Sequence, residues 1–436
     1  MDAGTVLIIV AIFFVVLMAC EVPIAFVLAL SGAVGILLSR GWDVTTAAMG
    51  NTPFTAVANY SLSIVPMYIL VGVFAVFARI AEHVYMVADR LLFRVRGGLG
   101  VATIMACAGF AAVSGSSVAT AATIGRLSID EMRKRGYPDT LAAALVAAAG
   151  TLGILIPPSI ILAIYGILTR ISIADLLAAG IVPGLVEVLV YATYIVIRGP
   201  GRKHRLTAVS TRPFRDLPWR GAVRVAIIFA LVMAGIYSGV FTVTESGALG
   251  ALFALVFMVV ELRPEGIQRV LAVVKAAFLE VAAVTSMSFF IFIGSSIFTF
   301  FLVSAGIPTA FVRWVTSLEM NPTLIVAVLL LVLVPLGMFL DSLSILVIFV
   351  PITFPVVSAL GFNGIWFGIL VVCMIELGQI TPPIGINAYV VSGISGIPPE
   401  RVFRGVWPFT ALDILISLII FVFPPVVLFL PNLVGS

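Results

Sequence analysis

Two short polar clusters interrupt apolar stretches of the chain, and their side chains are suited to hold a cation. The first cluster reads SGSS at residues 114–117, and the second places Asp341 beside Ser342, with Ser344 close behind. Hydroxyl and carboxylate oxygens are the ligands that hard cations such as sodium take. Ser and Thr hydroxyls also bond across packed membrane helices, so a structural role for any one of them stays open.

Two proline pairs lie in apolar segments that otherwise favour helices. Each pair follows a glycine at the same spacing, Gly153 before Pro157 and Gly378 before Pro382. A proline has no N–H to donate, and its ring collides with the carbonyl four residues back, so both helices must unwind. Unwound backbone is tolerated at membrane depth only where it is buried or lines a watery cavity. The freed carbonyls suit a cation, and the half-helix that follows each break offers its N-terminus to an anion.

Asp341 is the single residue that most strongly indicates a functional site, because a carboxylate within an apolar segment is costly and marks a functional site by default. It could coordinate a cation, or it could cap the helix that follows it. Glu376, just before the second break, could serve similarly. Four other acidic residues lie nearer the ends of apolar segments, where we expect interfacial water to solvate them: Glu21, Glu187, Glu245 and Asp413.

The composition is that of a polytopic membrane protein. Of 436 residues, 62% are hydrophobic and 10% are charged, and the mean hydropathy is +1.26. Soluble domains carry about 25% charged residues. The first twenty residues have no basic segment and no cleavage site, so we interpret them as a retained span.

The scattered cysteines and histidines argue against an enzyme. Cys20, Cys107 and Cys373 all lie in apolar segments and show neither a disulfide framework nor metal-ligand spacing. His83 and His204 lie in expected loops without catalytic neighbours. A nucleic-acid partner is not expected either, since the formal charge of +4 reflects membrane orientation.

Apolar segments long enough to cross a bilayer predict an all-α fold. The segments 98–126 and 322–353 carry polar residues midway, so we expect re-entrant hairpins that enter and leave on one side. With that topology, all Lys and Arg residues except Arg40, Arg170 and Arg313 fall on one face, which is therefore cytoplasmic, and both termini lie outside. Amphipathic connectors are expected near 42–58 and 263–280. The expected crossings are 3–20, 22–39, 60–79, 139–169, 175–197, 224–240, 245–261, 282–304, 364–395 and 406–430.

The two proline-broken segments belong to an internal repeat. A single shift of the chain aligns Gly153 with Gly378, and the same shift aligns Gly180 with Gly405. We expect a first repeat at 1–197, with its hairpin at about 98–126 and its broken helix at 139–169. A cytoplasmic loop at 198–223 leads to a second repeat at 224–436, with its hairpin at about 322–353 and its broken helix at 364–395. Basic residues flank only the first hairpin, so the repeats are inverted, as in secondary transporters.

Four long motifs carry a family resemblance over essentially the whole chain: SGSSVATAATIGRLSIDEMRKRGYP, GTLGILIPPSIILAIYG, GMFLDSLSILVIFVPI and GQITPPIGINAY. They closely resemble the large membrane (M) subunit of the tripartite ATP-independent periplasmic (TRAP) transporters. The resemblance implies an elevator-type fold like that of the ion transporter superfamily. It also implies sodium-driven import of an organic acid, a dicarboxylate or a sialic-acid-like carboxylate, across the bacterial inner membrane. A stand-alone ion-coupled carboxylate or anion transporter is the alternative.

The resemblance also implies partners and site residues. A separate small four-helix membrane subunit (Q) and a periplasmic substrate-binding protein (P) would complete the transporter. Many relatives have an acidic residue where this chain has Thr120, so the substrate is not named from the motif. Sodium ions, the only implied cofactor, would be held by Ser114, Gly115, Ser116, Ser117, Gly150 and Gly153 at one site and by Asp341, Ser342, Gly378 and Thr381 at another. Substrate would lie near Ser116, Thr120, Pro158, Pro383 and Asn387.

Overall fold

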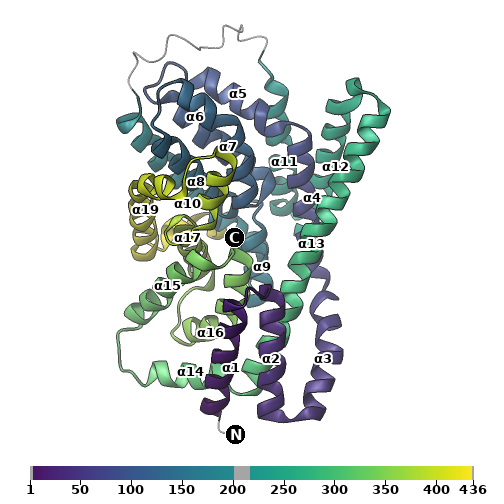
Figure 1. Cartoon of the computed structure of the whole chain (residues 1–436), viewed down its shortest axis with the longest axis vertical. Coiled ribbons are helices and arrows are strands. Elements are labelled where there is room, and N and C mark those ends of the chain that lie inside the picture. Colours follow the sequence, from purple (N-terminus) through teal and green to yellow (C-terminus); the bar gives the residue numbers. More distant parts are fainter. Residues whose placement is uncertain (1–2, 201–216, 435–436) are drawn as a thin grey trace.

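The computed structural model describes residues 3–200 and 217–434, and every regular element in these ranges is a helix (Figure 1). Eight of these helices are long and apolar enough to cross a membrane, or nine when the bent pair α8–α9 counts as one span. The chain is therefore an all-helical, multi-span membrane protein, as the sequence predicts.

The helices fall into two successive sets. The first set comprises α1 (Ala3–Ala19), α2 (Ile24–Arg40), α3 (Trp42–Val57), η1 (Tyr60–Ser63), α4 (Ile64–Phe77), α5 (Ile80–Leu92), α6 (Gly98–Ser114), α7 (Ser117–Lys134), α8 (Asp139–Leu155), α9 (Ile160–Thr169) and α10 (Ile173–Arg198). The second set comprises α11 (Trp219–Tyr237), α12 (Val243–Leu262), η4 (Arg263–Glu265), α13 (Ile267–Ser304), α14 (Ile307–Thr316), α15 (Pro322–Phe339), α16 (Ser342–Ala359), α17 (Gly364–Ile380), α18 (Ile386–Ser395), α19 (Pro399–Val422) and α20 (Pro425–Val434).

The two expected hairpins form, and local chemistry explains their tips. Gly115 joins α6 to α7 with a φ of +62°, a conformation that glycine adopts without steric cost. Ser116 then caps α7 by accepting a hydrogen bond from the Ala119 amide at 3.3 Å. Asp341 caps α16 in the same way, since its Oδ2 accepts from the amides of Leu343 and Ser344 at 3.0 and 3.2 Å. Of the two open roles for Asp341, the capping role is confirmed.

Both proline pairs break their helices where expected. The axis bends by 42° between α8 and α9, and Ser159 caps α9 through the Leu162 amide at 3.2 Å. The second break lies between α17 and α18, where Gly385 has a φ of +52°. Each break leaves a few residues of backbone without helical hydrogen bonds inside the protein.

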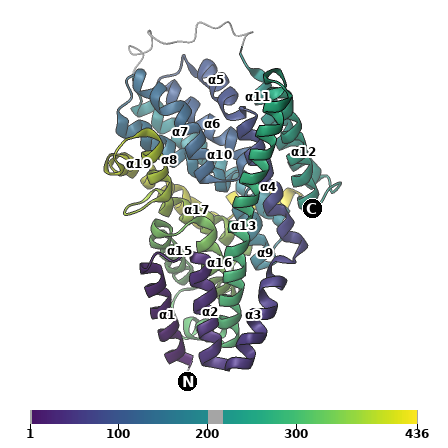
Figure 2. The same ribbon diagram turned by 45° about the vertical axis from the view of Figure 1, so that its right-hand side comes forward.

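The prediction of two separate connectors, at 42–58 and 263–280, is wrong. Residues 263–280 do not form a separate element, because α13 runs unbroken over 38 residues, a length of about 57 Å. Gly266 starts this helix, and no proline interrupts it. Segment 42–58 forms α3, which packs along α2 and α13 instead of crossing their ends (Figure 2).

Charged side chains link helix α5 to the end of α7 and to α12. Arg135, just after α7, donates two hydrogen bonds to Asp89 of α5, at 2.7 and 2.8 Å. On the other side, His83 of α5 lies 3.7 Å from Glu261 of α12, which also pairs with Arg224 at 2.6 Å. Burial lowers the pKa of His83, so this side chain favours its neutral form. Helix α5 thus links the first hairpin to α12.

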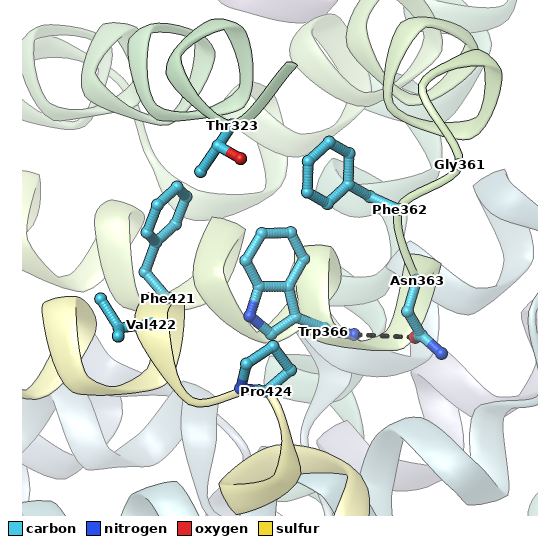
Figure 3. Close-up of a pocket in the computed structure, with 8 residues that line it drawn as sticks. All are labelled: Thr323, Gly361, Phe362, Asn363, Trp366, Phe421, Val422 and Pro424. Atoms are coloured by element: carbon cyan, nitrogen blue, oxygen red, sulfur yellow. Dashed lines mark hydrogen bonds between the residues drawn. The ribbon is translucent and has the colours of Figure 1, made fainter. Parts of the chain in front are cut away.

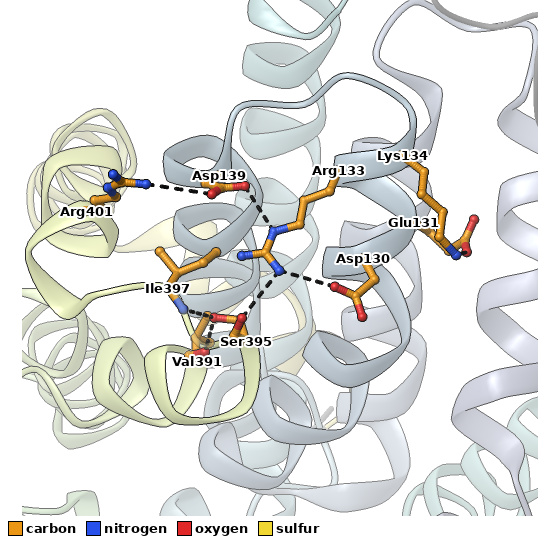
Figure 4. A network of polar contacts seen from close by, with 9 residues as sticks. All are labelled: Asp130, Glu131, Arg133, Lys134, Asp139, Val391, Ser395, Ile397 and Arg401. Atoms are coloured by element: carbon orange, nitrogen blue, oxygen red, sulfur yellow. Dashed lines mark hydrogen bonds and ion pairs between the residues drawn. The ribbon is translucent and has the colours of Figure 1, made fainter.

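A second polar network joins the two halves of the chain (Figure 4). Arg133, near the end of α7, donates to Asp139 at the start of α8 at 3.0 Å, and to the Ser395 carbonyl at 3.3 Å. The Ser395 carbonyl ends α18 and has no acceptor role within its own helix. Asp139 in turn lies 3.9 Å from Arg401 of α19. One guanidinium therefore holds the first hairpin against the far end of the second broken helix.

Candidate functional site

A cavity of about 470 Å³ lies where the two hairpin tips meet. Its wall is formed by the tips of α6–α7 and α15–α16, by both helix breaks, and by one face each of α4 and α13. The polar residues that line it are Ser114, Ser116, Ser117, Glu280, Ser288, Asp341, Ser342 and Gln379. Two tips that are far apart in sequence thus line one cavity.

Gln379 connects the two tips. Its Oε1 accepts a hydrogen bond from the Ser117 hydroxyl at 3.1 Å, and its Nε2 donates to the Ser342 hydroxyl. The side chain is 1% exposed, so both of its polar ends depend on these partners. Gln379, next to the second helix break, therefore holds both hairpin tips through its single side-chain amide.

The first tip is closed by its own hydroxyls. Ser114 and Thr120 share a hydrogen bond of 2.9 Å, and the Thr120 hydroxyl lies 2.8 Å from the Ser116 carbonyl, to which it donates. Thr120 is fully buried and does not line the cavity. Thr120 therefore stabilises the tip through its hydrogen bonds to Ser114 and Ser116, on the side away from the cavity.

Glycines let the tips approach the helix breaks closely. A Cβ at Gly153 would lie 2.4 Å from the Ser116 carbonyl oxygen, and one at Gly115 would lie 2.8 Å from the Pro158 carbonyl oxygen. In the other half, a Cβ at Gly378 would meet Gly337 of α15 at 2.6 Å. In the first half these contacts place carbonyl oxygens of the tip and the break beside the facing backbone, which suits a hard cation. In the second half the close contact is between α17 and α15.

The residues predicted for sodium lie at these two tip-and-break regions, with two qualifications. Gly150 packs against Ala121 of α7, and a Cβ at Gly150 would lie only 2.6 Å from the Ala121 Cβ, so this glycine serves helix packing. Thr381 donates its hydroxyl to the Leu377 carbonyl at 2.6 Å, within its own half of the break. The described residues hold no group of three or more His, Cys, Asp or Glu that could bind a metal ion. Hydroxyl and carbonyl oxygens, with Asp341, are the donors present, and this set fits sodium.

Of the residues predicted for substrate, only Ser116 lines the cavity. Pro158 is buried behind the first tip, and Pro383 is exposed elsewhere. Asn387 is fully buried, and neither its Oδ1 nor its Nδ2 has a hydrogen-bond partner. Contacts of substrate with Thr120, Pro158, Pro383 and Asn387 stay predictions, because none of these four residues lines the cavity.

Three polar cavity residues were not predicted by name: Gln379, Glu280 and Ser288. Gln379 stands beside Gly378 within the GQITPP motif, so its position next to a break was a usable signal. Glu280 lies outside the recognised motifs, so the sequence offered no comparable signal for it. It lines the cavity with Val284, Met287 and Ser288, and this spacing places all four on one face of α13.

The prediction that Glu187 and Asp413 are solvated at span ends is wrong. They are 3% and 7% exposed, and the Tyr191 hydroxyl donates to Asp413. Glu376 is also 3% exposed, and none of the three forms an ion pair with a described Lys or Arg. Position along a segment does not reveal which face of a helix a carboxylate occupies, and α10, α17 and α19 pack against one another here.

A second pocket, of about 460 Å³, lies at the far ends of α17 and α19 (Figure 3). Trp366 stacks on Phe362 with ring centres 5.5 Å apart, and its Nε1 donates to the Ile420 carbonyl at 2.9 Å. Asn363 caps α17 through the amides of Ile365 and Trp366. These contacts hold helix ends together and bring no convergent polar groups to the pocket.

Comparison with known proteins decides the family. Residues 11–426 match the family described as "Tripartite ATP-independent periplasmic transporter, DctM component". The chain belongs to this TRAP permease family. Its members are transporter permeases and not enzymes.

Relatives of this TRAP permease cover nearly the whole chain. It is 36% identical to the C4-dicarboxylate TRAP transporter large permease protein DctM of Pseudomonas aeruginosa, over 94% of each chain. It is 30% identical to the sialic acid permease SiaM of Vibrio cholerae, over 96% of each chain. It is 31% identical to the isethionate permease DctMQ of Oleidesulfovibrio alaskensis, covering 96% of this chain and 65% of that protein.

The fold of the permease also resembles a solved transporter. The YdaH transporter of Alcanivorax borkumensis superposes with a TM-score of 0.62 over 89% of each chain, at 14% sequence identity. This similarity concerns the fold alone.

Proposed function

We propose that this permease is a sodium-coupled secondary transporter that imports an organic acid across the bacterial inner membrane by an elevator mechanism. The observation that carries the proposal is the cavity between the two hairpin tips, where hydroxyls, carbonyls and Asp341 converge beside helix N-termini. Named relatives that carry C4-dicarboxylates and sialic acid support the substrate class.

The order of elements supports two inverted repeats, 1–197 and 224–436, joined by the loop 198–223. Residues 201–216 of this loop lie outside the described part of the chain. In each half, a hairpin precedes a broken helix, as α6–α7 precedes α8–α9 and α15–α16 precedes α17–α18. Such pairs of hairpins and broken helices surround the substrate site of many secondary transporters. Both hairpins are then re-entrant, and the termini lie outside.

In this proposal the two tip-and-break regions each hold sodium. Ser114, Ser117 and the backbone around Gly153 provide oxygens on one side, and Asp341, Ser342 and the backbone around Gly378 provide them on the other. Bound sodium would supply positive charge beside the substrate's carboxylate. Gln379 holds the two tips in register, because it bonds to both. The N-terminus of α7, next to Ser116, orients the carboxylate.

Hairpins and broken helices form the moving unit, and α2, α12 and α13 belong to the scaffold. Cysteines introduced at Ser116 and Ser342 are expected to change accessibility in opposite senses between the outward and inward states. Invariant accessibility at both positions would contradict the elevator.

The permease is expected to work with two partners. The family is tripartite, and the relative DctMQ is longer than this chain, which covers 65% of it. We propose that a small membrane subunit and a periplasmic binding protein are the remaining components.

The test is uptake of radiolabelled organic acids into proteoliposomes that hold the chain and its small partner. Uptake should require both an inward sodium gradient and the binding protein. Uptake that proceeds without the gradient would refute sodium coupling, and uptake indifferent to the binding protein would favour a stand-alone transporter.

A further inference from the structure

The charge of the cavity is unusual for a site that would take a dianion. Two carboxylates line it, Asp341 from the second tip and Glu280 from α13, and none of its described lining residues is Lys, Arg or His. Moving a net negative charge into a membrane protein without a cation nearby is costly. The cavity residues therefore disfavour a solute with two carboxylates.

The two carboxylates differ in what they face. Asp341 is committed to its own helix, since it accepts from the Leu343 and Ser344 amides and from the Ser344 hydroxyl. Glu280 is exposed to the cavity, and it takes part in none of the ion pairs of the described residues. Glu280 is therefore the carboxylate that is free to meet a solute.

The N-termini of α7 and α16 differ in whether a negative side chain compensates their partial positive charge. The N-terminus of α16 is countered by the Asp341 carboxylate, whereas the N-terminus of α7 is capped only by the neutral Ser116 hydroxyl. An uncompensated helix N-terminus attracts an anion. The cavity thus offers a place for one carboxylate at the first tip and a negative side chain on the α13 wall.

We propose that this permease transports a zwitterion, a solute with one carboxylate and one cationic group, and that Glu280 binds the cationic group. This assignment rests on the proposed function and narrows its substrate class. One sodium ion at each proposed site would cancel the charges of Asp341 and Glu280. A zwitterion would leave the loaded cavity neutral, whereas a dicarboxylate would leave it with two negative charges.

The test compares solutes that share a skeleton and differ in one charged end. Succinate is paired with 4-aminobutyrate, and glutarate with 5-aminovalerate. Binding of each to the full chain in lipid nanodiscs is measured by calorimetry in sodium chloride. The aminocarboxylate of each pair should bind about tenfold more tightly than its dicarboxylate partner, a difference typical of one ion pair in a partly dry site.

The variant Glu280→Gln should reduce that preference to about onefold to twofold by weakening aminocarboxylate binding. The matched control Glu400→Gln removes an exposed carboxylate at the start of α19, outside the cavity, and should retain the preference. Tighter binding of the dicarboxylates, or an unchanged preference in Glu280→Gln, would overturn the zwitterion assignment while the proposed transport function stands. Binding of none of the four solutes would also overturn the zwitterion assignment, and the uptake assay with the binding protein then decides whether the proposed transport function stands.

Discussion

The Ser117 hydroxyl donates a hydrogen bond of 3.1 Å to Gln379, across a separation of 262 residues in the chain. Ser117 begins the returning helix of the first hairpin, and Gln379 lies one residue before the end of α17, the first half of the second broken helix. Gln379 also donates to Ser342 at the other tip. This buried amide therefore makes the geometry of each tip depend on the other.

Replacing Gln379 by Ala should uncouple the tips. The Ser117 and Ser342 hydroxyls would each lose a buried partner, so the free energy of unfolding should fall by about 1–3 kcal/mol. Sodium-dependent uptake should fall more than expression does. The exposed Gln268→Ala on α13 serves as the control. A double-mutant cycle with Ser117→Ala should give a coupling of at least about 0.5 kcal/mol; additive effects would show that the bond contributes nothing.

Substitutions of Asp341 separate its capping role from its proposed sodium role. Asn caps helices about as well as Asp, whereas Ala does not. Asp341→Asn should therefore keep the thermal stability of the wild type and lose sodium affinity, while Asp341→Ala should lose about 1 kcal/mol of stability as well. Thermal unfolding and sodium titration in detergent measure the two effects. If Asp341→Asn binds sodium as the wild type does, the carboxylate acts as a cap only.

Gly153→Ala should displace the first tip, because the new methyl group would lie 2.4 Å from the Ser116 carbonyl oxygen. Overpacking of this kind typically costs about 1–3 kcal/mol. Sodium-dependent uptake should be lost in parallel. Gly393→Ala is the control, since a Cβ there meets nothing within 4 Å. Normal uptake by Gly153→Ala would mean that close contact between this tip and its break is not needed.

Arg133→Ala should weaken the attachment of α18 to the first hairpin. It removes the donor to the Ser395 carbonyl and the partner of Asp139, and the expected loss is about 1 kcal/mol. The adjacent Lys134→Ala breaks an ion pair whose side chains are 65% and 36% exposed, so its effect on stability should be clearly smaller than that of Arg133→Ala. Chemical or thermal unfolding of the two variants compares them directly. Equal losses would remove any special role for the Arg133 network.

The features that the sequence predicted correctly have local causes. Proline pairs break helices by sterics, and Gly115 and Asp341 turn or cap the hairpins through their own backbone and side chain. The features it missed depend on tertiary packing. No local pattern shows that Gln379 reaches both tips, that α13 continues through residues 263–280, or that Glu187 and Asp413 turn inward. Helix faces are set by neighbouring helices, which hydropathy along one segment does not reveal.

The most direct test of the account is reciprocal binding of sodium and solute to the purified chain. If both bind around the same pair of tips, replacing potassium by sodium should tighten binding of the preferred solute by about tenfold, and saturating solute should tighten sodium binding by the same factor. Calorimetry in the two salts measures both factors. Equal solute affinity in sodium and potassium would contradict a shared site.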